Sequence, residues 1–185
     1  MAACAHAGLT FPTTSPAGVL RAGDVVEFLV NDLHGPGTTT AFITRIDEKG
    51  EVTLPMLKPV AVAGLTNDAA GPPVAKAYEA AGMISGPVVT ATIVATAAQM
   101  PVKPGPLAAG DTVRVSIFDL TGPGRRTEVD ACVAADGSVT LPALGKLPLA
   151  GQTEATAARA ISKAYSDQQI MTNAMVHVLR TASGT

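Results

Sequence analysis

Aromatic residues are scarce in this chain of 185 residues: four Phe and two Tyr make up 3% of it, and tryptophan is absent. Sugar-binding modules need aromatic platforms, so this composition disfavours a small glycan-binding module. Excess positive charge is also missing, because 13 Lys and Arg stand against 15 Asp and Glu. A formal net charge of −2 does not provide the basic surface of a nucleic-acid-binding protein. Long apolar runs are lacking too, and none approaches the roughly 18 to 20 residues of a membrane-spanning helix.

Cysteine is the next residue in short supply. Cys4 and Cys132 are too few for a disulfide framework or a zinc site. We expect both cysteines to be free thiols, and a single disulfide bond between Cys4 and Cys132 is the alternative. Residues 1–12 have neither a basic region nor a continuous apolar stretch, so they are not an intact secretion signal. The chain is therefore cytosolic, or a leader was removed before this numbering begins.

What the chain does contain is an internal repeat with a constant offset of 87 positions. About a third of the positions between Leu20 and Ile93 are identical to their partner in the second copy, without any gap. The same offset recurs in five separate segments, which does not happen by chance, so the sequence indicates a tandem duplication. The repeated turn and strand-start residues form a predicted structural motif: Gly23, Asp24, Gly35, Gly37, Gly50, Pro55 and Gly64, then Gly110, Asp111, Gly122, Gly124, Gly137, Pro142 and Gly151.

The duplication predicts four segments. Residues 1–18 form an extended leader, and residues 19–95 form the first domain. Residues 96–106 contain three prolines and a glycine, which is typical of a stiff linker. Residues 107–181 form the second domain.

Reading each copy against the other predicts its strands. In Val25–Val30, alternate residues are apolar, and the same positions of the second copy hold Val113, Val115 and Ile117. A period of two that both copies keep indicates a half-buried strand. A second alternating run follows in each copy, and Lys49-Gly50 and Asp136-Gly137 then predict tight hairpin turns.

One helix is expected in each copy. Thr153 is a suitable N-cap, and Ala157, Ile161 and Tyr165 follow it at helical spacing. In the first copy Pro72 and Pro73 fall inside the corresponding segment, so we expect that helix to restart at Pro72. Each copy closes with a strand, which predicts an α+β fold: two tandem small domains, each a mostly antiparallel or mixed β-sheet with one helix.

In this order of elements, each copy resembles the polysaccharide export domain of bacterial capsular polysaccharide export proteins. The matching residues are Gly23-Asp24 and Gly110-Asp111 at the first strand, the run from Asp136 to Gly145, and the run from Leu149 to Thr153. The resemblance covers the chain from about Leu20 to Arg180. It implies a non-enzymatic, ring-forming envelope protein of the periplasm, outer membrane or cell surface, with itself and polysaccharide as partners.

Nothing in the sequence predicts catalysis, a metal or a cofactor. Asp24 and Asp111 each follow a glycine at a strand start, where an aspartate commonly caps a turn through backbone N–H groups. The three histidines, His6, His34 and His177, are not shared between the copies, and we expect surface positions for them. We therefore predict that the chain is not an enzyme and holds no cofactor.

The copies differ on the outer face of the sheet. Val25 and Leu29 stand where the second copy has Thr112 and Ser116, and Ile43 stands where it has Asp130. An apolar outer face in one copy predicts an interface between domains or subunits, with Phe11 of the leader as a further candidate. The alternative is that loops or the leader cover this face.

Two functions follow. The first is an export or assembly component that works as a homo-oligomer. The alternative is a structural subunit of an extracellular fibre, tube or surface layer, in which β-strands are added to a neighbouring sheet.

Overall fold

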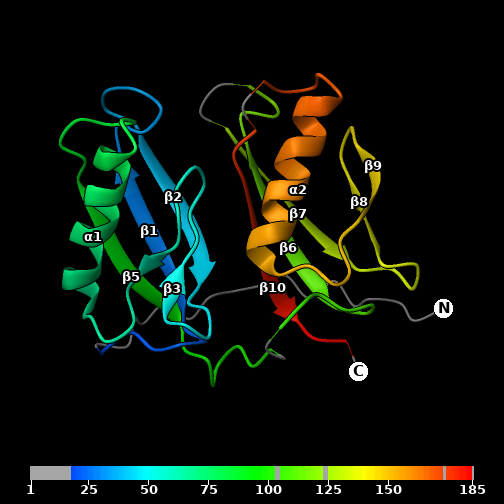
Figure 1. Ribbon diagram of the computed structural model, residues 1–185, viewed down its shortest axis with the longest axis horizontal. Helices are drawn as coiled ribbons and strands as arrows, with labels where there is room; N and C mark the ends of the chain where they lie inside the picture. The colour runs from blue at the N-terminus through cyan, green and yellow to red at the C-terminus, as the bar shows by residue number, and fades with distance from the viewer. Residues whose placement is uncertain (1–17, 103–104, 123–124, 173, 185) are drawn as a thin grey trace. The chain divides into compact units, whose positions relative to one another are not determined.

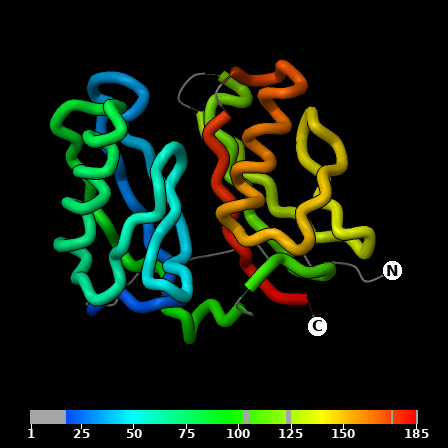
Figure 2. Tube along the Cα trace, viewed as in Figure 1, coloured from blue at the N-terminus to red at the C-terminus, as the bar shows by residue number. Residues whose placement is uncertain are grey.

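The computed structural model describes residues 18–102, 105–122, 125–172 and 174–184. The chain divides into two compact units between Pro101 and Val102. Both units follow the same chain path (Figure 2).

The first unit contains five strands and a helix. A three-stranded antiparallel sheet has the order β2-β1-β5, from Thr39–Arg45, Val25–Asn31 and Val89–Ala95. A small hairpin pairs β3 (Glu51–Val52) with β4 (Val60–Ala61). Helix α1 (Asn67–Ala80) packs against β5 (Figure 1).

The second unit repeats these elements 87 positions later. Its antiparallel sheet has the order β10-β6-β7, from Val176–Ala182, Thr112–Phe118 and Arg126–Cys132. The hairpin pairs β8 (Ser138–Leu141) with β9 (Gly145–Pro148), and α2 (Glu154–Asp167) packs against β10. The predicted α+β fold with two tandem repeats is confirmed.

The predicted alternation sets the strand register. Phe28 of β1 faces Phe42 of β2, and both are almost fully buried. In the second unit Val115 of β6 faces Val129 of β7. Because side chains alternate between the two faces of a strand, this register directs one apolar row of each sheet toward the helix. The core of the second unit gathers there: Leu107, Val113, Val115, Ile117, Val133, Val139, Leu141, Leu149, Ala157, Ile161, Tyr165, Ala174, Val176 and Val178.

Both helices begin at the predicted threonine caps. The Thr66 hydroxyl oxygen accepts the N–H of Ala69, and that of Thr153 accepts the N–H of Thr156. These bonds satisfy donors that a helix N-terminus otherwise leaves unpaired.

The prediction that the first helix restarts at Pro72 is wrong, because α1 runs without a break and contains Pro72 and Pro73. The two prolines leave the carbonyls of Asp68 and Ala69 without their usual helical donors. Both of those residues are exposed, so water can bond their carbonyls. The opposite side of the helix buries Ala70, Gly71, Val74 and Tyr78, and this packing supports the unbroken helix.

Candidate functional site

The two repeated aspartates close their units in the same way. Asp24 Oδ2 accepts the N–H of Arg21 at 2.9 Å, and its Oδ1 accepts the N–H of Ala97 at 3.0 Å. Asp111 accepts the N–H of Ala108 at 2.9 Å and that of Gly184 at 2.8 Å. Each carboxylate thus joins the segment before the first strand to the segment after the last strand. We call this arrangement the aspartate clasp.

A glycine precedes each aspartate because the backbone segments approach closely there. Gly23 has a φ of +88°, and a Cβ atom added to it would lie 2.8 Å from the Cβ of Ala97. Gly110 has a φ of +89°, and a Cβ atom there would lie 3.2 Å from the Cα of Gly184. A side chain at either position would therefore push the closing segment away from the carboxylate.

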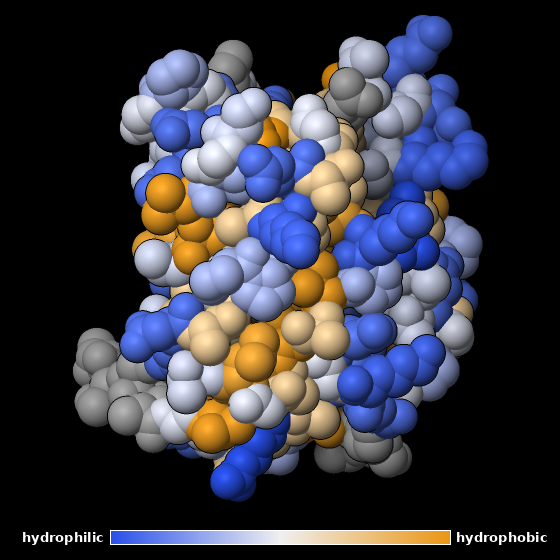
Figure 3. Space-filling model, turned by 60° about the vertical axis from the view of Figure 1, so that its left-hand side comes forward, coloured by the Kyte–Doolittle hydropathy of each residue, from blue (hydrophilic) through white to orange (hydrophobic). Residues whose placement is uncertain are grey.

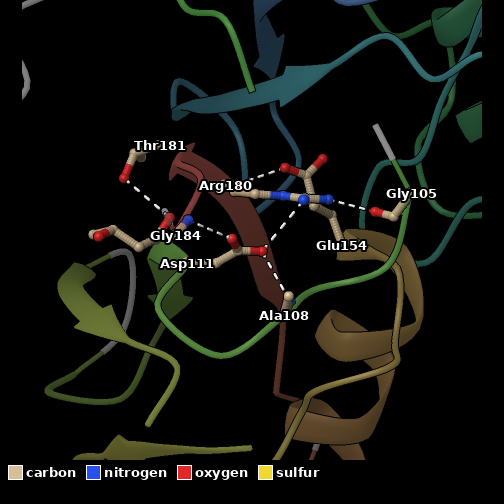
Figure 4. Close-up of polar contacts among 8 residues, drawn as sticks. Gly105, Ala108, Asp111, Glu154, Arg180, Thr181 and Gly184 are labelled. Atoms are coloured by element: carbon tan, nitrogen blue, oxygen red, sulfur yellow. Dashed lines mark hydrogen bonds and ion pairs between the residues drawn. The ribbon is translucent and has the colours of Figure 1, made fainter. Parts of the chain in front are cut away.

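The clasp of the second unit also contains a buried ion pair. Arg180 Nη1 lies 3.2 Å from Asp111 Oδ2, and the two side chains are 5% and 3% exposed. Arg180 Nη2 donates to the carbonyl of Gly105, and the Arg180 backbone N–H donates to Glu154 Oε1 (Figure 4). The first unit has Ile93 at the position of Arg180, so its clasp consists of backbone bonds to Asp24 alone.

The remaining motif residues lie in turns. The carbonyl of Gly50 accepts the N–H groups of Val62 and Ala63, and the carbonyl of Gly137 accepts those of Leu149 and Ala150. A second set of backbone bonds joins Gly64 to Leu20, and Gly151 to Leu107. Pro55 and Pro142 each precede a residue with positive φ, and Gly35, Gly37 and Gly122 lie in the loops after β1 and β6. Gly124 lies outside the described residues.

Tyr78 and Tyr165 occupy equivalent positions in the two copies, but their hydroxyl groups differ in hydrogen bonding. The Tyr165 hydroxyl donates to the carbonyl of Pro142 at 2.7 Å. The Tyr78 hydroxyl is buried without a hydrogen-bond partner among the described residues. Burial raises the pKa of both hydroxyls, so both stay protonated at neutral pH.

The outer faces of the two sheets carry different chemistry. In the second unit Arg114 donates two hydrogen bonds to Asp130, each 2.8 Å long, and this bonding raises the pKa of Arg114. The first unit has Glu27 and Ile43 at these positions. Among the candidate interface residues, Leu29 and Ile43 are half-buried and Val25 is fully buried, whereas Phe11 lies outside the described residues.

The expected surface position of His177 is wrong. This side chain is 7% exposed, and burial lowers its pKa to about 4. It lies on the face of β10 opposite Val176 and Val178, where a surface residue was expected. His34 is partly buried in the loop after β1, and His6 lies outside the described residues. No group of three or more His, Cys, Asp or Glu side chains with metal-binding geometry occurs in the described part of the chain.

The expectation of two free thiols is also wrong, since Cys132 is disulfide-bonded. Cys132 ends β7 opposite Thr112 and is half-buried, while its neighbour Val133 is 1% exposed. This agrees with the alternation of a strand, in which neighbouring side chains point to opposite faces. Cys4 lies outside the described residues.

Sequence reasoning missed Arg180 and Glu154 as members of the second clasp. A signal was present, because Arg180 shares its strand parity with the buried Val176 and Val178. A lone charge in an inward row needs a partner of opposite sign, and Asp111 provides it.

The comparisons with known proteins agree with this duplicated architecture. The family model described as polysaccharide biosynthesis/export protein matches the chain twice, over residues 12–94 and 102–179. No curated protein matches the chain. Among the described residues, no helix is long and apolar enough to span a membrane. Because the two matches cover most of the sequence, the chain belongs to the polysaccharide biosynthesis/export protein family and carries two tandem copies of its domain.

Proposed function

We propose that this chain is a non-enzymatic, self-associating protein of the cell envelope that forms part of an assembly for glycan export. The observation that carries the proposal is the double family match, which places both copies in the polysaccharide biosynthesis/export protein family. The partners are further copies of the chain and the polysaccharide. The location is the periplasm, at the outer membrane or the cell surface.

The use of the polar residues supports a scaffold role. Asp24 and Asp111 bind backbone N–H groups within their own units, and Arg180 neutralises Asp111. These charges are buried and already paired, which is typical of groups that hold a fold together.

We retain the expected domain limits, 19–95 and 107–181, with a leader at 1–18 and a linker at 96–106.

The alternative function is a structural subunit of a fibre, tube or surface layer built by β-strand addition. The pairing of strand β5 supports this alternative. In the described part of the chain, β5 pairs with β1 along one side only. An unpaired sheet edge is a template for another strand. Negative-stain microscopy of the purified protein separates the two functions, since closed rings support export and open filaments support the structural role.

Deletion of the gene in the source organism tests the export function. We expect surface polysaccharide to fall while polysaccharide accumulates inside the cell, and the wild-type gene to restore both amounts. A deletion strain with unchanged surface and internal polysaccharide would contradict the proposal. A chain carrying Gly23→Val and Gly110→Val, which disrupts both clasps, is the control that should not restore export.

A further inference from the structure

The end of strand β7 carries a covalently bonded cysteine. Cys132 is the last residue of β7 and forms a disulfide. The sequence contains one other cysteine, Cys4, which belongs to the leader and lies outside the described residues. Within this protein, the partner of Cys132 is therefore Cys4 of the same chain or a cysteine of another copy.

The equivalent position of the first unit fastens a segment that lies outside its sheet. Arg45 is the last residue of β2 and stands 87 positions before Cys132. Its Nη1 donates to the carbonyl of Gly23 at 2.7 Å and to that of Met100, in the linker, at 3.3 Å. A cysteine has no charged fork of donors that can hold two carbonyls in this way. The corresponding strand end of the second unit has a covalent bond instead.

We propose that Cys132 is bonded to Cys4 of the same chain, so that the leader is fastened to the second unit. The first unit already holds the other end of the leader, where the N–H of Leu20 donates to the carbonyl of Leu65 at 2.8 Å. Residues 5–17 separate Cys4 from the described chain, and at full extension they span about 45 Å, more than the roughly 30 Å diameter of a small domain. The leader is then a strap that links the two units in addition to the linker.

The competing arrangement for the leader is a purely apolar contact. Figure 3 shows a band of apolar residues bordered by hydrophilic ones on one face of the molecule. The leader contains Leu9 and Phe11, and such side chains bury apolar area on a surface of this kind. An apolar contact by itself leaves the thiol of Cys4 free and provides no partner for Cys132. The bonded state of Cys132 therefore favours the strap.

The strap depends on the redox conditions around the protein. When the bond forms, the two thiols lose two protons and two electrons, and a disulfide oxidant such as glutathione disulfide accepts them and becomes two thiols. Structural disulfides persist in oxidising compartments, which include the bacterial periplasm. The strap is therefore closed in the periplasmic location that we propose, and a reductant opens it.

Peptide mapping of the full chain tests the pairing. The protein is oxidised with glutathione disulfide and separated on a non-reducing gel, and the monomer band is digested with trypsin without a reductant. We expect the peptide of residues 1–21 to be joined to that of residues 127–146, and the two to separate after reduction. Peptides that are not joined in the monomer band, or that are joined only in a covalent dimer, would overturn the bond within one chain.

Substitutions test the strap by its effect on stability. Cys4→Ser and Cys132→Ser remove the same bond, so each should lower the thermal midpoint of the oxidised chain by the same amount, and the double variant should lower it no further. The reduced wild type should share this lower midpoint. Ser15→Ala changes the leader but keeps both cysteines, and as the matched control it should keep the wild-type midpoint. A Cys4→Ser chain with the midpoint of the oxidised wild type would show that the leader is not fastened at Cys132.

Discussion

At the scale of single residues, Asp111 and Arg180 form the most buried charged pair among the described residues, and the first unit provides a natural comparison. Asp24 has the same two backbone donors as Asp111 but no arginine, because Ile93 replaces Arg180. A buried carboxylate in this fold is therefore sufficiently stabilised by two N–H groups. Arg180 in turn forms its ion pair with the Asp111 carboxylate, at 3.2 Å.

We expect Asp111→Asn to destabilise the second unit by about 3 to 5 kcal/mol, since it removes the carboxylate that lies 3.2 Å from the buried guanidinium of Arg180. Arg180→Ile recreates the arrangement of the first unit and should cost clearly less. Differential scanning calorimetry of both variants measures the difference. Equal losses of unfolding free energy in the two variants would mean that removal of the ion pair itself, rather than a buried arginine that has lost its carboxylate, determines the destabilisation.

The two tyrosines provide a second matched pair. Tyr165→Phe removes a hydrogen bond and leaves the Pro142 carbonyl without it, so we expect a loss of about 1 kcal/mol. Tyr78→Phe removes a buried hydroxyl without a partner, so stability should stay the same or rise. Calorimetric midpoints compare the two. A loss for Tyr78→Phe as large as for Tyr165→Phe would show that Tyr78 has a hydrogen-bond acceptor.

His177 makes the stability depend on pH. Burial lowers its pKa to about 4, against about 6.5 in the unfolded chain. Between these values the unfolded state binds more protons, so the contribution is complete above pH 6.5 and is lost as the pH falls toward 4. Relative to His177→Gln, the wild type should lose up to about 1.4 kcal/mol of unfolding free energy per pH unit in this window. Urea unfolding at pH 4.5 and 7 measures it, and parallel losses in both chains would exclude His177 as the cause.

At the scale of elements, the approach of α1 to β5 depends on one glycine. A Cβ atom on Gly71 would lie 2.1 Å from the carbonyl oxygen of Val89, so only a residue without a side chain fits. The second unit has Ala158 at the same position of α2. The two helices have equal lengths and equivalent threonine N-caps, so this position is one at which their packing residues differ.

Gly71→Ala should destabilise the first unit by at least about 2 kcal/mol, despite the higher helix propensity of alanine. The clash involves backbone, which cannot move aside as a side chain can. Ala158→Gly in α2 is the control and should cost about 1 kcal/mol through propensity alone. Thermal unfolding compares the two variants. A stabilising Gly71→Ala would mean that α1 and β5 lie further apart than described.

At the scale of the whole molecule, the chain consists of two units that repeat the same sheet, hairpin and helix, each with its own core. A domain of this size buries little apolar surface, so closure by backbone bonds and covalent links matters. The aspartate clasp closes each unit, and the disulfide at Cys132 adds a covalent constraint in the second.

The disulfide predicts how the oxidised protein responds to alkylation. We expect iodoacetamide to leave Cys132 unmodified even in denaturant, because a disulfide has no thiolate to react. After reduction the same residue should be fully alkylated, and peptide mass spectrometry detects the change. Modification of Cys132 in denaturant without a reductant would show that the thiol is free.

Much of the architecture follows from local sequence patterns. The offset of 87 positions, the alternation in the strands and the threonine caps Thr66 and Thr153 are local patterns. They predicted an α+β fold in two copies, because strand faces and helix starts depend on residues close together in the chain. The glycines of the turns are also local signals, because each is required by the backbone geometry at its own position.

The contacts that join distant residues are set by tertiary packing. Whether Pro72 ends a helix depends on how strongly the buried face of α1 packs on the sheet, which no local pattern states. The Asp111–Arg180 pair, the burial of His177 and the disulfide of Cys132 likewise arise where separate segments meet. Propensity acts over a few residues, whereas burial and charge pairing depend on which segments the fold brings together, and for that reason these contacts became visible only in three dimensions.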